Sequence, residues 1–166
     1  MFLKQHVIDL FQDDAPCSTS DVFPSSSVQI TCEATNLSPV TQLTIWRRRS
    51  GTFVDYPTAL TIGQSNGEER TCGGVRSEDE RYVDIEFGAG EYMIGVEVCF
   101  DTANQPYIVA GSFKISTNIA VYGPYGLAFC SGVTHVMRGF QLNNIGTQTG
   151  EGIDNMRFGF DRCIGV

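Results

Sequence analysis

Residues 111–126 read GSFKISTNIAVYGPYG. The first half of this stretch predicts a strand, and its end, Gly123-Pro124-Tyr125-Gly126, predicts a tight turn, because glycine and proline favour turn conformations. Further strands follow, and the glycine-bordered loop from Gly150 to Asp154 presents the Asp154 carboxylate at the start of the last strand. The C-terminal third of the chain therefore predicts strands joined by tight turns.

The composition of the whole chain agrees with an all-β domain. The chain has 166 residues, of which 42% are hydrophobic. This length is enough for one domain with a filled hydrophobic core but too short for two domains of ordinary size. Eighteen glycines and only 18% charged residues favour short strands over helices. We therefore expect a single all-β domain.

Strand patterning begins at Val28, and the cleanest alternation runs from Tyr82 to Phe87, with the carboxylates of Asp84 and Glu86 on the wet face. Several short strands at this spacing are typical of a sandwich, a barrel or a prism. About ten strands are expected, at Val28–Cys32, Leu43–Trp46, Thr58–Ile62, Tyr82–Phe87, Tyr92–Phe100, Tyr107–Ser116, Ile119–Tyr122, Leu127–Cys130, His135–Leu142 and Ile153–Phe160.

The motif order SFKISTN, YGPYG, VMRGF, GxxxD, MRFGF resembles that of the jacalin-related lectins. This resemblance implies an all-β fold of the β-prism I type, built from three Greek-key sheets. The resemblance covers about Gln42 to Phe160, and we expect residues 28–166 to form the prism. In residues 1–27, the helical spacing of the first apolar residues predicts an N-terminal arm, and the polar run around Cys17 predicts a disulfide-tethered loop. By the same resemblance, the chain is a lectin that binds a monosaccharide or a glycan terminus at the GxxxD loop.

The site residues carried over from that family are Gly150, Glu151, Gly152 and Asp154. Asp154 can accept two charge-assisted hydrogen bonds from sugar hydroxyls. The backbone N–H groups of Glu151 and Gly152 are the expected donors, and the glycines are expected to leave room for the sugar ring. The alternative is that Asp154 only fixes the turn through bonds to nearby backbone N–H groups.

The chain departs from the family at its N-terminal side. Many jacalin-type lectins complete the site with a glycine-rich segment near their start, and nothing similar occurs before Gly51. The only Gly-Gly pair is Gly73-Gly74. A second loop at Gly90 has Ile94 where an aspartate would be needed, so no second lectin site is expected there.

The cysteines and the charge indicate the compartment and the partners. Six cysteines spread over the chain without a CxxC predict disulfides and a secreted protein, and the sequon Asn36-Leu37-Ser38 agrees with a secreted glycoprotein. A formal net charge of -8 disfavours nucleic acid and anionic lipid as partners. No membrane insertion is expected, because no segment reaches the 18 continuous apolar residues of a membrane span.

The N-terminal segment Met1–Phe11 is apolar but does not have the pattern of a normal signal peptide. It is interpreted as an arm that docks on the body of the protein or on a second copy, and the alternative is a frayed tail. Glycans or glycoproteins are thus the expected ligands, with a homo-oligomer or a larger extracellular assembly as the form of association.

Enzymatic activity is not expected. His6 and His135 are the only histidines, and HExxH, GxSxG and a phosphate-binding glycine loop are all missing from the sequence. The carboxylates of Asp84 and Glu86 are expected on the solvent-exposed face of a strand. Acid–base catalysis by two carboxyl groups needs different pKa values, and nothing on that face would make their pKa values differ. We expect no catalytic residues, no metal and no cofactor.

Other interpretations of the sequence remain open at this point. Cys32 and Trp46 are spaced as in strands B and C of an immunoglobulin domain. The run Arg47-Arg48-Arg49 is interpreted either as a site for anionic glycans or as a solvated strand end, and Tyr122 and Tyr125 either stack on sugar or pack on each other. The last strand also resembles the egg vitelline outer-layer proteins, so the alternative function is a structural subunit of an extracellular coat.

Overall fold

The structure is a computed structural model that describes residues 24, 32–49, 54–103, 108–150 and 152–162. Among these residues, no helix is long and apolar enough to cross a membrane. The strands of the described residues are β1 (Cys32–Ala34), β2 (Val40–Arg48), β3 (Pro57–Gln64), β4 (Glu69–Gly73), β5 (Asp79–Glu86), β6 (Met93–Asp101), β7 (Val109–Thr117), β8 (Val121–Gly126), β9 (Gly132–Arg138), β10 (Phe140–Thr149) and β11 (Ile153–Arg162).

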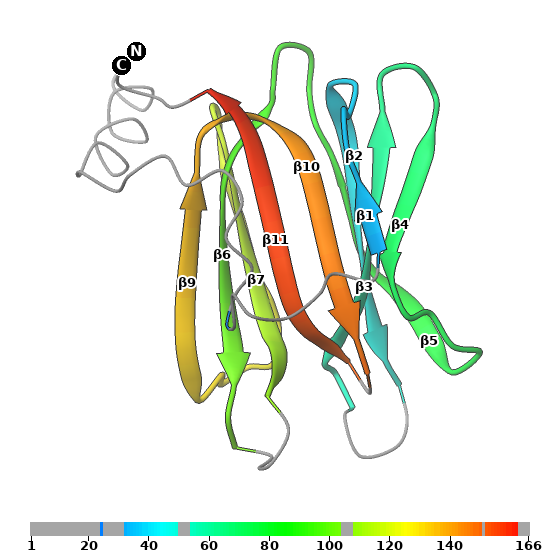
Figure 1. Ribbon diagram of the computed structural model, residues 1–166, viewed down its shortest axis with the longest axis vertical. Coiled ribbons are helices and arrows are strands. Elements are labelled where there is room, and N and C mark those ends of the chain that lie inside the picture. Colours follow the sequence, from blue (N-terminus) through cyan, green and yellow to red (C-terminus); the bar gives the residue numbers. More distant parts are fainter. Residues whose placement is uncertain (1–23, 25–31, 50–53, 104–107, 151, 163–166) are drawn as a thin grey trace.

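The strands form three antiparallel sheets around a common interior (Figure 1). Sheet A has the order β1-β10-β11, sheet B the order β4-β3-β2-β5 and sheet C the order β8-β7-β6-β9. In sheets B and C, three hairpin-connected strands are followed by a fourth that returns beside the first, which is the Greek-key order. The predicted all-β prism is confirmed.

The antiparallel order places the chain reversals at two opposite ends of the prism. The connections β2–β3, β4–β5, β6–β7, β8–β9 and β10–β11 lie at the lower end in Figure 1, and the connections β1–β2, β3–β4, β5–β6 and β7–β8 lie at the upper end. The loop from Gly150 to Asp154 belongs to the lower end. Both ends are made of loops, and the scaffold between them is rigid sheet.

The interior is filled by one face of each sheet. Phe100 and Phe113 of sheet C and Phe158 of sheet A are each at most 1% exposed. Leucine and isoleucine residues surround them, and those that are less than 2% exposed are Leu43, Ile45, Leu60, Ile62, Ile115, Leu142, Ile145 and Ile153. Burying each such side chain contributes about 1.5–3 kcal/mol before the loss of chain entropy, so this core dominates the stability of the fold.

The seams between the sheets are closed in different ways. A disulfide from Cys32 of β1 to Cys72 of β4 joins sheets A and B, with 5.5 Å between the α-carbons. Sheets B and C meet through aromatic pairs, in which Tyr82 packs on Tyr125 at 6.4 Å and Phe87 packs on Tyr122 at 6.3 Å between ring centroids. Tyr122 and Tyr125 therefore pack on residues of sheet B within the seam and not on each other, and their stacking on a sugar stays a prediction.

A second disulfide joins Cys99 of β6 to Cys130 beyond β8. The prediction of two or three disulfides is thus met by two among the described residues, while Cys17 and Cys163 lie outside them. The immunoglobulin interpretation is wrong, because Cys32 pairs with Cys72 and the Trp46 indole N–H donates to Thr61 Oγ1 at 2.9 Å. The predicted arm, residues 1–27, lies almost wholly outside the described residues, and its docking stays a prediction.

Several predicted strand boundaries are wrong. The predicted turn at Gly123–Gly126 belongs to β8, which is an edge strand with a cis Gly123–Pro124 bond. The predicted strand Leu127–Cys130 is a bend, and the predicted strand His135–Leu142 is divided at Gly139 into β9 and β10. Strand β4 was not predicted.

Replacing a core phenylalanine tests this account of the interior. We expect Phe113→Ala to lower the free energy of unfolding by about 3–5 kcal/mol, because it leaves a cavity between the sheets. The matched control is Phe129→Ala, whose side chain is 93% exposed and whose replacement is expected to change stability by less than about 0.5 kcal/mol. Urea denaturation measures both variants, and equal losses would contradict the proposed core.

Candidate carbohydrate-binding loop

The loop between β10 and β11 is a tight connection at the lower end of the prism. Its geometry is fixed by the Gly150 N–H, which donates to the Gly152 carbonyl at 3.0 Å. Ile153 is fully buried and anchors the start of β11, next to the half-buried Asp154. Glu151, a predicted site residue, lies outside the described residues.

Asp154 and Gly150 lie directly against each other. A Cβ atom placed on Gly150 would be 2.6 Å from Asp154 Oδ2, a distance that real Cβ atoms do not show. Any other residue at position 150 would therefore displace the carboxylate. The structure brings these two predicted residues together at the tip of the hairpin.

The sequence predicts that Gly150 and Gly152 leave room for a sugar ring. In the structure, both glycines lie close to neighbouring residues. The space above the Gly150 α-carbon is filled by the Asp154 carboxylate. Gly152 is buried, and a Cβ on it would lie 3.5 Å from Val109 at the start of β7 and 3.8 Å from the Pro57 carbonyl at the start of β3. Their role is to let the loop pack on its neighbours, so a ligand must approach from the Asp154 side.

The β4–β5 connection lies beside this loop. Gly74 faces Thr149, since a Cβ on it would be 3.7 Å from Thr149 Oγ1. Arg76 Nη2 donates to the Gly150 carbonyl at 3.5 Å, across 74 positions of sequence. A Gly-Gly segment thus lies beside the GxxxD loop, although it comes from a different part of the chain than the family pattern implies.

A buried ion pair holds this connection in place. Arg48 Nε and Asp79 Oδ1 are 2.7 Å apart, and their side chains are only 4% and 0% exposed. The other oxygen of Asp79 accepts the backbone N–H of Arg76 at 2.9 Å. The pair therefore fixes the backbone from which the Arg76 guanidinium reaches the hairpin, a role that the sequence alone did not indicate.

The other arginines of the run Arg47-Arg48-Arg49 are also engaged with carboxylates. Arg47 pairs with Glu80 at 2.7 Å and with Asp55 at 3.2 Å, and its guanidinium lies 4.2 Å from the Tyr82 ring centroid. The hydrogen bond to Glu80 raises the pKa of Arg47. Arg49 follows the end of β2, its side chain is 66% exposed, and it pairs with Glu80 at 3.3 Å. The solvated strand end therefore describes Arg49 but not the buried Arg48, and binding of an anionic glycan by this run stays a prediction.

A second GxxxD spacing, from Gly51 to Asp55, occurs in the β2–β3 connection at the same end of the prism. Residues 51–53 lie outside the described residues. Asp55 adopts a left-handed backbone with φ of 68°, donates its N–H to the Arg48 carbonyl at 2.8 Å and directs its carboxylate to Arg47. The repeated spacing was the signal that would have drawn attention to this loop.

The loop at Gly90 has Ile94 where a lectin site would need an aspartate. Ile94 is a core residue at 5% exposure.

The carboxylates considered for acid–base chemistry are not suited to it. Hydrogen bonds from Thr44 and Arg81 hold the pKa of Asp84 below its usual range, against a smaller opposing effect of burial. Burial lowers the pKa of His135, which favours the neutral ring. Within the described part of the chain, no group of three His, Cys, Asp or Glu side chains is arranged to hold a metal ion.

A β-prism that carries a glycine-bordered aspartate on one hairpin defines a class of non-catalytic sugar-binding domains. The Jacalin-like lectin domain matches residues 27–159, and the chain belongs to this family. The family consists of non-catalytic carbohydrate-binding proteins, in agreement with the expectation that the chain is not an enzyme. No curated protein sequence matches at a significant level.

Solved lectin structures share the fold. The Calsepa lectin, solved in complex with a bisected glycan, has a TM-score of 0.68 and 18% identity, covering 90% of this chain and 100% of its own. The mannose-binding jacalin-related lectin AcmJRL from Ananas comosus has a TM-score of 0.60 and 16% identity, with 85% and 94% covered. A galactose-binding lectin from Champedak has a TM-score of 0.61 and 16% identity, with 76% and 94% covered.

Breaking the buried ion pair tests its role in holding the β4–β5 connection. We expect Asp79→Ala to lower the free energy of unfolding by about 3–5 kcal/mol, because it breaks a buried ion pair by removing one of its two charges. Glu80→Ala is the matched control, since its side chain is 29% exposed and such pairs contribute about 0–1 kcal/mol each. Similar losses in thermal or chemical unfolding would argue against a special role for Asp79.

Proposed function

We propose that this protein is a secreted lectin that binds a monosaccharide or a glycan terminus at the loop from Gly150 to Asp154, without catalysis. The observation that carries the proposal is the Asp154 carboxylate, which lies over the α-carbon of Gly150. Arg76 donates a hydrogen bond to the carbonyl of the same glycine. A carboxylate held in this way is a fixed acceptor at the end of a rigid hairpin. Fixed polar groups of this kind give a small ligand its orientation.

The chemistry of the loop suits two neighbouring sugar hydroxyls. Each hydroxyl donates to one oxygen of Asp154, and hydrogen bonds to an ionised acceptor are shorter and stronger than neutral ones. The backbone N–H groups of Glu151 and Gly152 and the guanidinium of Arg76 supply donors to hydroxyl or ring oxygens. The similar structures include a mannose-binding and a galactose-binding lectin, which supports a saccharide ligand without selecting the sugar.

Secretion is proposed from the cysteines and the sequon. Two disulfides link strands or loops that are 40 and 31 positions apart in the sequence, and such bonds persist in oxidising compartments. Asn36 lies in the exposed turn between β1 and β2, with φ of 52°. An exposed turn is accessible to modification, so the glycoprotein prediction is retained as part of this proposal.

A structural subunit of an extracellular coat is the second candidate. It is favoured by the exposed apolar side chains Phe129, Val133 and Val136, which are 93%, 56% and 42% exposed. Exposed apolar groups of this size often lie in contacts with other proteins. A coat subunit would use one or more of these exposed apolar side chains, or the predicted arm, for homo-oligomeric assembly, and would not need to bind sugar.

The replacement Asp154→Asn tests the site, because it removes the charge and keeps the shape. Losing a charged acceptor costs about 1.5–3 kcal/mol, which weakens glycan binding by about tenfold to a hundredfold. Calorimetry with a glycan bound by the wild type measures the change, and Asp84→Asn on sheet B is the matched control. Unchanged affinity of Asp154→Asn would refute the site, and a loss of folding would favour the turn-fixing interpretation.

The replacement Ser38→Ala tests glycosylation at Asn36. We expect the protein from a secreting eukaryotic culture to carry a glycan, and the variant to lose that added mass while it keeps its melting temperature. The fold is expected to survive because it is the Ser38 backbone N–H, not its hydroxyl, that donates to Gln64 Oε1 at 2.8 Å. Mass spectrometry decides, and a wild-type mass equal to that of the bare chain would contradict the glycoprotein prediction.

A further inference from the structure

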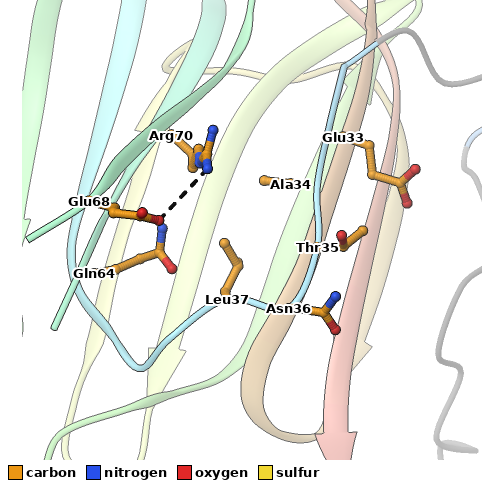
Figure 2. A pocket seen from close by; sticks show the side chains of 8 residues that line it. All are labelled: Glu33, Ala34, Thr35, Asn36, Leu37, Gln64, Glu68 and Arg70. Atoms are coloured by element: carbon orange, nitrogen blue, oxygen red, sulfur yellow. Dashed lines mark ion pairs between the residues drawn. The ribbon is translucent and has the colours of Figure 1, made fainter. Parts of the chain in front are cut away.

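A cavity of about 330 Å³ opens at the upper end of the prism, opposite to the GxxxD loop. Figure 2 shows that it lies between the β1–β2 turn and the β3–β4 turn. Strand β1 and the turn after it contribute residues 33–37, and the β3–β4 hairpin contributes Gln64, Glu68 and Arg70. In Figure 2 the side chains of Glu33 and Asn36 point away from Glu68 and Arg70. The cavity is therefore at the upper end of the seam between sheets A and B.

The walls of this cavity are held together by hydrogen bonds and a disulfide. The Ser38 N–H donates to Gln64 Oε1 at 2.8 Å, and the Ser65 N–H donates to the Pro39 carbonyl at 2.9 Å. The Cys32–Cys72 disulfide joins the two strands that border the cavity. Because both turns are fixed, the cavity exists before any ligand binds, which reduces the entropy lost on binding.

The cavity combines an acceptor, two kinds of donor and an apolar floor. Glu68 and Arg70 are 3.7 Å apart, and their side chains remain 58% and 61% exposed. The Gln64 oxygen is engaged by Ser38, and Figure 2 shows the Gln64 amide nitrogen turned toward Glu68. Leu37, which is 8% exposed, points into the cavity between these groups.

We propose that this cavity is a second saccharide-binding site, at the pole opposite to the GxxxD loop. A sugar ring carries hydroxyls that both donate and accept, which matches Arg70, Gln64 and Glu68, and C–H groups that match Leu37. Glu68 and Arg70 carry opposite formal charges, and the third charged lining residue, Glu33, is paired with Arg157. The cavity therefore favours a neutral ligand over a phosphate or a carboxylate. Its volume lies near the lower limit of the about 300–1,000 Å³ that is typical of ligand pockets, which suits one sugar ring.

Two sites at opposite poles make a single chain bivalent. The proposal of an upper site depends only on the cavity. Bivalency depends also on the proposed function of the GxxxD loop. A bivalent monomer bridges two glycans without forming an oligomer, and its avidity on a glycan-covered surface exceeds the affinity of either site.

Amide NMR titrations test the second site separately from the first. Isotope-labelled Asp154→Asn protein, made in bacteria so that Asn36 carries no glycan, is titrated with mannose, galactose and N-acetylglucosamine. We expect at least one of these sugars to shift the amide signals of Leu37 and Gln64 in a saturable manner. Because this protein lacks the Asp154 charge, the shifts do not depend on the GxxxD site.

Variants of the cavity complete the test. Glu68→Ala and Arg70→Ala are each expected to weaken these shifts about tenfold in apparent affinity, the effect of about 1.4 kcal/mol, while Glu69→Ala on the same strand edge is the matched control. Both replaced side chains are exposed, so the fold is retained. The proposal is overturned if none of the three sugars shifts these amides, or if the shifts persist undiminished in both cavity variants. Failure of the GxxxD site alone would instead leave the Leu37 and Gln64 shifts intact.

Discussion

One face of each of the three sheets must be buried against the other two, and this requirement determines where the loops of the molecule lie. Phe100, Phe113 and Phe158 occupy the shared interior, and each is at most 1% exposed. A sheet that buries one face and wets the other alternates apolar and polar residues. The antiparallel strands then return the chain to one of two poles after each pass, so ligand-binding groups can be placed only on the outer faces or at the poles.

The lower pole is rigid because buried contacts support its loops. Gly152 packs on Val109, and the Arg48–Asp79 ion pair holds the backbone of Arg76. Buried ion pairs often add little net stability, and their best-attested use is to specify one arrangement over others. Here the specified arrangement is a guanidinium beside the hairpin that carries Asp154. Groups held in this way lose little freedom when a ligand binds.

Much of the fold was predictable from local sequence. The alternation from Tyr82 to Phe87 correctly gave β5, whose Asp84 and Glu86 are exposed. The predictions failed at two edge strands, β4 and β8, because residues of an edge strand need not alternate and because proline is tolerated there. Strand β4 has only one buried residue, Cys72, and β8 contains Pro124 among glycines, so neither looked like a strand.

The candidate site was predictable only in part. The GxxxD spacing places Gly150 and Asp154 on one hairpin whatever the rest of the fold does, and the structure brings them together. Arg76 is 74 positions away from Gly150, and the pairing of Arg48 with Asp79 crosses 31 positions. Such long-range contacts depend on how the sheets pack, which no local pattern encodes. The same holds for the upper cavity, whose two turns meet only after sheets A and B have closed their seam.

Carbohydrate binding by this prism is tested by exposing the purified, disulfide-bonded chain to an array of defined glycans. We expect saturable binding to at least one glycan, and competition by the free monosaccharide that terminates it. Binding to no glycan on the array, by protein that is folded and oxidised, would contradict carbohydrate binding and would favour a structural subunit that keeps the prism without its sugar site.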